Sequence, residues 1–112
     1  LPVPKKNLKA YTALAKLACK VWLEHGALDY RECVAEDVKP GKLTSFPQSV
    51  KLKTGETVVF SWIEWPDKAT RDAGAEKVMK DERMQPKEGE DMPFVGARLI
   101  YGGFEVLLDA KG

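Results

Sequence analysis

The sequence has little of several features on which whole classes of protein depend. It contains two cysteines, Cys19 and Cys33, and one histidine, His25. Two cysteines without Cys-x-x-Cys spacing exclude a disulfide scaffold and give no metal-binding motif. No apolar run approaches the roughly 18 residues of a membrane-spanning helix, and the first residues lack the apolar core of a signal peptide. We expect a cytoplasmic protein that needs no metal or cofactor and does not enter a membrane.

Neither positive nor negative side chains are in clear excess. The 18 lysines and arginines oppose 17 aspartates and glutamates, for a formal net charge of +1. A protein that binds nucleic acid usually presents a clearly basic face, because it must neutralise phosphates. Nucleic acid is therefore not expected as a partner. What is present is a chain of 112 residues, 44% hydrophobic and 31% charged, which suits one globular domain over residues 1–112.

Two segments have the pattern of helices. Residues 5–25 repeat apolar side chains at intervals of three and four, and Gly26 can take the left-handed conformation that ends a helix. Asp67 is a suitable N-cap for a second helix that runs to about residue 82. Gly74 inside this second helix is expected to weaken it by about 1 kcal/mol relative to alanine.

Three segments have the composition of strands. Residues 27–36 alternate in polarity, and residues 57–65 combine β-branched and aromatic side chains without a breaker. Residues 98–108 form the last predicted strand, in which Gly102-Gly103 indicates a bulge or a close approach of the backbone. Residues 43–53 can form an extended arm, whose Pro47 favours an edge or irregular strand.

The order of these elements predicts an α+β fold. A strand before the first helix would complete β-α-β-β-α-β, the ferredoxin-like order with an antiparallel sheet. Only Leu1-Pro2-Val3 is available there, so the first strand is expected to be truncated. Two helices cover one face of such a sheet and leave roughly 500 Å² of the other bare. A homodimer that packs sheet against sheet would cover both bare faces and enclose a space for a small-molecule ligand.

One set of side chains could line that space. If the faces of the three predicted strands coincide, they share Tyr30, Glu32, Trp62, Glu64, Tyr101 and Glu105. Carboxylates held among aromatic walls have raised pKa values and can carry protons. The alternative is that each glutamate lies at a strand end in water or pairs with an arginine. Val59 and Ile63 offer a helix the smaller surface, so Trp62 is expected on the face away from the helices.

The remaining reactive side chains have mainly structural interpretations. His25 lies at the end of the first predicted helix, where the helix dipole favours its charged form. We expect it to cap that helix. Arg71, in the first turn of the second helix, is a candidate anion-binding residue; the alternative is an ion pair. Cys19 and Cys33 are expected to be small buried hydrophobes. The catalytic residues, if there are any, stay unknown.

Motifs over nearly the whole chain are similar to those of the YbaA-like proteins, a small bacterial family with a domain of unknown function. They are Gly26–Leu28, Glu32-Cys33, Gly41–Phe46, Val58–Glu64, Pro66, Arg71–Ala73, Asp81–Met84, Met92–Phe94 and Ile100–Glu105, the last two being the most specific. The resemblance implies a ferredoxin-like fold of the dimeric α/β-barrel group and no established activity. Family members usually begin with a Tyr-Val-Asp-Gly-Phe-like first strand, and this chain starts after it.

Two functions from different classes remain open. The first is a pocket that binds a small apolar or aromatic molecule without chemistry. The second is a cofactor-independent enzyme that resembles the small monooxygenases of the same fold group, which act on aromatic substrates; this rests on analogy of fold. A pocket lined only by apolar groups would favour binding. A buried glutamate within hydrogen-bonding reach of a tyrosine or tryptophan would favour chemistry.

Overall fold

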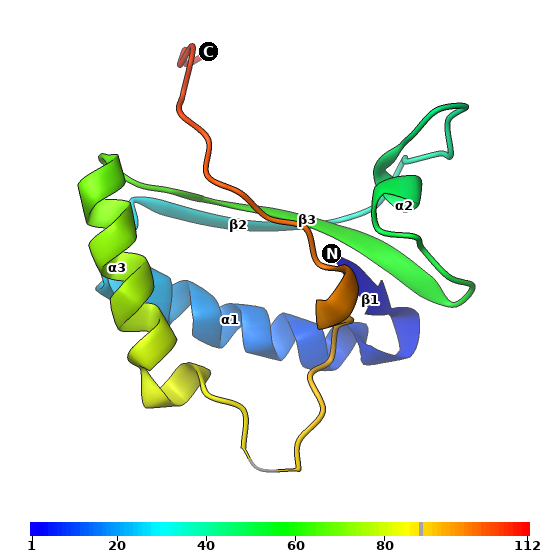
Figure 1. Ribbon diagram of the computed structural model, residues 1–112, viewed down its shortest axis with the longest axis horizontal. Coiled ribbons are helices and arrows are strands. Elements are labelled where there is room, and N and C mark those ends of the chain that lie inside the picture. Colours follow the sequence, from blue (N-terminus) through cyan, green and yellow to red (C-terminus); the bar gives the residue numbers. More distant parts are fainter. Residues whose placement is uncertain (88) are drawn as a thin grey trace.

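The computed structural model describes residues 1–87 and 89–112 (Figure 1). Its sheet is antiparallel, with the strand order β1-β3-β2. The protein is therefore α+β, and both predicted helices and the first two predicted strands are confirmed. The elements are β1 (Pro2–Pro4), a 3₁₀ turn (Lys5–Asn7), α1 (Leu8–Glu24), β2 (Asp29–Val34), α2 (Phe46–Ser49), β3 (Glu56–Glu64), α3 (Lys68–Lys80) and two further 3₁₀ turns, Glu82–Met84 and Gly96–Arg98.

The register of β2 against β3 decides which side chains share a face. Tyr30 pairs with Ile63, and Arg31 pairs with Trp62. Directly paired residues point to the same face of a sheet, and successive residues point to opposite faces. Val59 lies on the face of Ile63 and is buried against Val3 and Tyr11. The expectation that Trp62 lies on the face away from the helices is thus confirmed.

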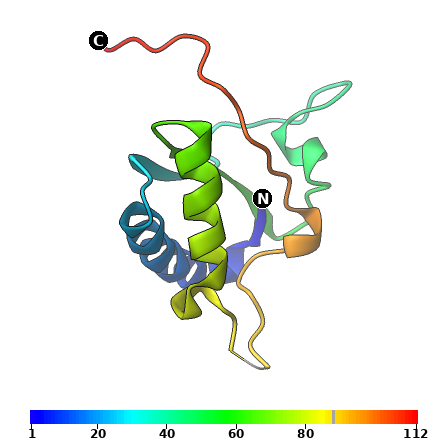
Figure 2. The ribbon, with the colours of Figure 1, turned by 60° about the vertical axis from the view of Figure 1, so that its left-hand side comes forward.

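Helix α1 lies on one side of the sheet, and α3 crosses the end of α1 at one end of the sheet (Figure 1, Figure 2). Asp67 caps α3 as predicted, because its carboxylate accepts a hydrogen bond from the Thr70 N–H at 2.7 Å. The rings of Trp22 and Trp65 meet edge to face, with centroids 5.8 Å apart. None of the helices among the described residues is both long and apolar enough to cross a membrane.

The end of α1 is held by an ionic cluster. Gly26 takes a positive φ of 110°, as predicted for the residue that ends this helix. His25 lies with its Nε2 3.1 Å from an Asp81 carboxylate oxygen, and Arg83 bridges Asp81 to Glu24. Hydrogen bonds from Arg83 and then from His25 hold the pKa of Asp81 well below its usual range. The cluster ties the end of α1 to the segment that follows α3.

The interpretation of residues 43–53 as an extended arm is wrong, because they contain the short helix α2. Ser45 caps this helix: its hydroxyl oxygen accepts from the Gln48 N–H at 3.3 Å. Pro47 lies in the first turn, where the missing N–H costs no helical hydrogen bond. The same proline that disfavours a central strand is therefore well suited to open a helix.

The predicted last strand is also wrong, since Gly96–Arg98 forms a 3₁₀ turn and residues 99–112 lie in no strand. This C-terminal segment leaves the sheet and ends away from both long helices (Figure 1, Figure 2). The reason lies in the first strand, which has only three residues, two of them proline. Pro2 and Pro4 have no N–H to offer a neighbouring strand, and the Pro2 carbonyl already accepts from the Val95 N–H at 3.0 Å.

Gly103 nevertheless makes the close backbone approach that its sequence predicts. A Cβ atom at this position would lie 2.5 Å from an Arg71 guanidinium nitrogen. The Arg71 side chain, which extends from the first turn of α3, therefore reaches the C-terminal segment at Gly103.

Arg98 anchors the start of the C-terminal segment to β3. Its guanidinium donates to a Glu56 carboxylate oxygen at 2.8 Å and to the carbonyls of Val50 and Lys51. The Arg98 and Glu56 side chains are only 16% and 10% exposed. Arg98, aided by the Lys53 N–H, lowers the pKa of Glu56 from 4.5 to about 2.

This lowered pKa predicts an acid-sensitive contribution to stability. A carboxyl group with a lowered pKa in the folded state stabilises the fold above its unfolded pKa and loses that effect as the pH falls. As the pH falls from about 4.5 to about 2, the free energy of unfolding of the wild-type protein should therefore decrease. Glu56→Gln has no carboxylate at this position, so it should lack this stabilisation at neutral pH and should not show this decrease. Denaturant unfolding across this range checks the expectation. A stability difference between wild type and Glu56→Gln that is equally large at neutral and at acid pH would contradict it.

Candidate functional site

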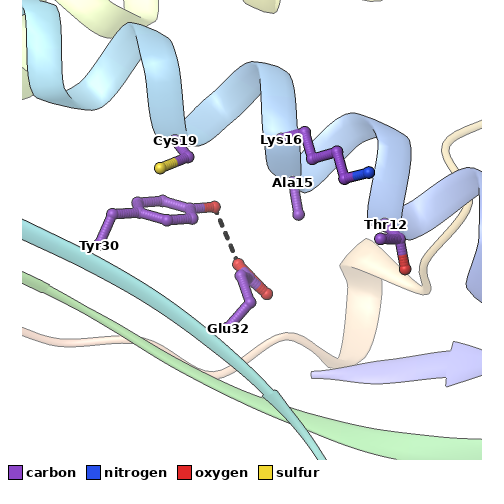
Figure 3. Close-up of a pocket in the computed structure, with 6 residues that line it drawn as sticks. All are labelled: Thr12, Ala15, Lys16, Cys19, Tyr30 and Glu32. Atoms are coloured by element: carbon purple, nitrogen blue, oxygen red, sulfur yellow. Dashed lines mark hydrogen bonds between the residues drawn. The ribbon is translucent and has the colours of Figure 1, made fainter.

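A cavity of about 220 Å³, widely open to solvent, lies between α1 and β2 (Figure 3). It opens on the face of the sheet that α1 covers. The residues that line it come from two elements only, α1 and β2: Thr12, Ala15, Lys16, Cys19, Tyr30 and Glu32.

The spacing of small residues on α1 explains why a cavity forms here. Tyr11, Ala15 and Cys19 are four residues apart and therefore share one face of the helix. Tyr11 is large and buried in the core, whereas Ala15 and Cys19 are small. Tyr30 and Glu32 lie opposite them on β2, so the short helix side chains leave room above the sheet (Figure 3).

The carboxylate of Glu32 is the polar centre of this site. Tyr11 donates its hydroxyl to one carboxylate oxygen at 2.6 Å, and Tyr30 donates to the other at 2.9 Å. Burial, followed by the neighbouring carboxylate, raises the pKa of both tyrosines well above the ordinary value of 10. Both phenols therefore stay protonated and remain donors. The arrangement fixes the position of the carboxylate among mostly apolar walls.

A second cavity of about 170 Å³ adjoins the first along α1. Glu32, Thr12 and Ala15 line both spaces, and Leu8, Tyr11, Cys33, Val34 and Val59 complete the second. The Glu32 carboxylate thus stands at the boundary of two adjoining hollows under one helix.

The six predicted pocket residues are not brought together. Trp62 and Glu64 point to the opposite face of the sheet from Tyr30 and Glu32, because the register pairs Tyr30 with Ile63 rather than with Trp62. Tyr101 and Glu105 lie in the exposed C-terminal segment, which is not part of the sheet. The hypothesis of a single face with three carboxylates is therefore wrong for this structure. Tyr11 was missed because it reads as part of the ordinary apolar stripe of a helix.

The face of the sheet away from α1 and α3 carries a row of aromatic side chains. Phe46 of α2 meets Phe60 with ring centroids 5.9 Å apart, and Phe60 meets Trp62 at 5.7 Å. The three side chains stay 45–55% exposed. The Arg31 guanidinium lies 5.7 Å from the centre of the Trp62 ring, within the range of a cation–π contact. We call Phe46, Phe60, Trp62 and Arg31 the aromatic face.

The other predicted side chains have structural surroundings. Arg71 lies 3.6 Å from its neighbour Asp72, in line with the ion-pair alternative, and borders Gly103 of the C-terminal segment. Cys19 is partly buried and lines the cavity. Cys33 is exposed, contrary to expectation, because it pairs with Phe60 on the uncovered face.

The sequence matches a known protein family. The sequence model of a family described as "Protein of unknown function (DUF1428)" matches residues 1–96. The chain belongs to the DUF1428 family. It is 50% identical over 107 residues to the uncharacterized protein YbaA of Escherichia coli K12, and equally to YbaA of Shigella flexneri. Each alignment covers 96% of this chain and 91% of the relative.

The stability of this DUF1428 protein should depend on the bond between Tyr11 and Glu32. Tyr11→Phe removes one hydrogen bond to a carboxylate and leaves the ring in the core. Such a bond contributes about 1.5–3 kcal/mol to the free energy of unfolding. Tyr30→Phe should cost less, since its bond is longer and its side chain lies nearer the surface. Urea unfolding of both variants checks the order, and equal losses would contradict it.

Proposed function

We propose that the protein binds a small apolar or aromatic molecule in the cavity under α1. The observation that carries the proposal is a carboxylate fixed by two tyrosines within a cavity whose other walls are largely apolar. Ligand sites are typically concave and apolar, with a few convergent polar groups that orient the ligand. A volume of about 220 Å³ lies below the usual range of drug-sized pockets, so a single-ring molecule is the fitting size.

A cavity-filling substitution tests this function. Ala15→Leu places a larger side chain in the space between α1 and β2, whereas Ala13→Leu makes the same change at an exposed position of the same helix. Benzyl alcohol serves as the probe, with binding followed by amide chemical shifts. We expect Ala13→Leu to bind like wild type and Ala15→Leu to bind at least tenfold more weakly. Equal binding by the two variants, or a wild type that binds neither benzyl alcohol nor its charged analogues, would refute the cavity as a ligand site.

We further propose that the protein is a homodimer that joins through the aromatic face. Helix α1 covers the opposite side of the sheet, while Phe46, Phe60 and Trp62 remain half exposed. A second copy is the occupant that this face favours, because the chain carries a net charge of only +1 and two copies repel each other little. The small-molecule site between two sheets, expected from the sequence, would require this dimer.

The C-terminal segment supplies the area that such a dimer needs. β3 and its neighbours offer roughly 400 Å² from standard strand spacings, and two such faces fall short of the ~1,000 Å² of a stable interface. The C-terminal segment adds Tyr101, Phe104, Leu107 and Leu108, which are 87–98% exposed. These side chains are too apolar to be left in water as a contiguous group. We propose that they pack against the second copy rather than beside β1, whose prolines leave that edge without N–H donors.

Light scattering at several protein concentrations tests the dimer. We expect twice the mass of one chain, and we expect Trp62→Ala to shift the equilibrium toward monomer without unfolding it. Slow amide exchange in residues 99–108 should accompany the dimer and fade on dilution. A monomer at micromolar concentration would overturn the proposal.

A second candidate function is cofactor-independent monooxygenation of an aromatic substrate. The observation in its favour is that Glu32 lies within hydrogen-bonding reach of two tyrosines, where a carboxylate can take a proton from a bound phenol. Oxygen uptake with hydroquinone, without any added cofactor, tests this candidate. Uptake that Glu32→Gln abolishes would support it, and absence of uptake by the wild type would exclude it for this substrate.

A further inference from the structure

We infer that the ligand of the cavity under α1 is a cation: a small aromatic or apolar molecule with a protonated amine, whose ammonium group pairs with Glu32. The inference rests on the proposed function, because it names the ligand class for the same cavity. Its starting observation is a carboxylate in the cavity wall that no positive side chain of the described residues neutralises.

The charges around Glu32 favour this ligand class. No ion pair joins Glu32 to a lysine, an arginine or the histidine among residues 1–87 and 89–112. Lys16 lines the cavity without forming an ion pair with the carboxylate. The Leu1 ammonium group is near enough to interact with Glu32 electrostatically, but it donates its hydrogen bond to the Val59 carbonyl. A partly buried carboxylate without a cationic partner attracts a positive ligand and repels an anionic one.

The hydrogen bonds of Glu32 leave room for such a ligand. An ionised carboxylate has about four lone-pair positions on its two oxygens. Tyr11 and Tyr30 each occupy one, on different oxygens. Each oxygen therefore keeps a free position, and an ammonium group has three N–H donors to offer. A charge-assisted hydrogen bond of this kind is about twice as strong as a neutral one.

The walls of the cavity suit the rest of the molecule. Ala15 and Cys19 present small apolar surfaces from α1, and the Tyr30 ring stands opposite them (Figure 3). The ring face also favours a neighbouring cation through its quadrupole. A metal ion is a poorer fit, because no group of three or more histidine, cysteine or carboxylate side chains in the described part of the chain could hold one.

Three probes of nearly equal shape separate charge from fit. Benzylamine carries a positive charge at neutral pH, benzyl alcohol carries none, and benzoate carries a negative charge. Calorimetric titration of the full chain at low salt gives the affinities. We expect benzylamine to bind at least tenfold more tightly than benzyl alcohol, and benzoate to bind more weakly than either.

Matched variants assign the effect to one carboxylate. Glu32→Gln keeps the shape and a hydrogen-bonding group but removes the charge, so it should cancel the preference for benzylamine. Glu64→Gln makes the same change in net charge on the opposite face of the sheet and should leave the preference intact. Lys16→Met removes the positive charge at the cavity and should strengthen benzylamine binding or leave it unchanged. Amide spectra of each variant establish that it is folded.

The outcomes distinguish this inference from the function on which it rests. If benzyl alcohol and benzylamine bind equally, the cavity binds ligands and the cationic class is refuted. If Glu32→Gln keeps the preference, or Glu64→Gln loses it, the charge acts from elsewhere and the inference falls. If no probe binds, the proposed function falls as well.

Discussion

Replacing Gly74 with alanine is expected to destabilise the protein, although alanine is the better helix former. A Cβ atom at this position would lie 2.5 Å from two carbon atoms of the Trp65 ring and 2.6 Å from the His25 carbonyl oxygen. The carbonyl belongs to the backbone at the end of α1 and cannot rotate away. Overpacking of this kind costs about 1–3 kcal/mol or more, which exceeds the ~1 kcal/mol that helix propensity returns. Gly74→Val should cost still more and prevent stable folding.

A neighbouring residue supplies the control for Gly74. Ala73→Gly changes propensity in the opposite direction at an exposed position of the same helix. It should lower the free energy of unfolding by about 1 kcal/mol through propensity alone. Denaturant unfolding of both variants is the measurement. If Gly74→Ala raises stability, the close contact between α3 and the end of α1 is not a constraint on the fold.

Truncation of Trp65 should have the other large effect. Its ring packs edge to face against Trp22 and borders both Gly74 and Gly26, so it joins β3, α1 and α3. Trp65→Ala therefore leaves a cavity where three elements meet. Large-to-small substitutions of this kind cost about 3–5 kcal/mol, a large share of the 5–15 kcal/mol that typically separates folded from unfolded domains.

Trp62→Ala is the matched comparison, because it removes the same side chain three residues away on the uncovered face. If the proposed dimer joins through the aromatic face, the stability lost in Trp62→Ala should depend on protein concentration, whereas the stability lost in Trp65→Ala should not. Thermal unfolding over a hundredfold range of concentration separates the two. A concentration-independent loss of equal size in both variants would contradict the assignment of Trp62 to an interface.

Most elements of the fold could be predicted from local patterns. The helix periodicity, the Asp67 cap, the Gly26 stop and the apolar run of β3 are each determined by residues close together in the sequence. The face of the sheet on which Trp62 lies could also be predicted, since the side chains on the two sides of this strand differ in bulk and polarity. The local pattern also places Gly74 inside a helix. It does not show why this residue must be glycine, because the cause is a tertiary contact with Trp65 and the His25 carbonyl.

The candidate site was harder to predict because it depends on register. The pattern of each strand defines two faces but does not say which faces of two strands coincide. The pairing of Tyr30 with Ile63 separates Glu32 from Trp62 and brings it to Tyr11 of α1 instead. A glutamate on the helix-facing side of a strand, opposite small residues of a helix, was the signal that could have located the cavity.

The prolines of β1 also decide which strands can join this sheet from outside. A strand that adds to an edge needs both carbonyls and N–H groups, and unprotected edges promote fibrillar aggregation. Pro2 and Pro4 remove the donors from the β1 edge, while the opposite edge, β2, carries the charges of Asp29, Arg31 and Glu32. Both edges thus discourage open-ended growth, one by missing donors and one by charge. The sheet can expose its aromatic face to a partner without offering its edges to a fibril.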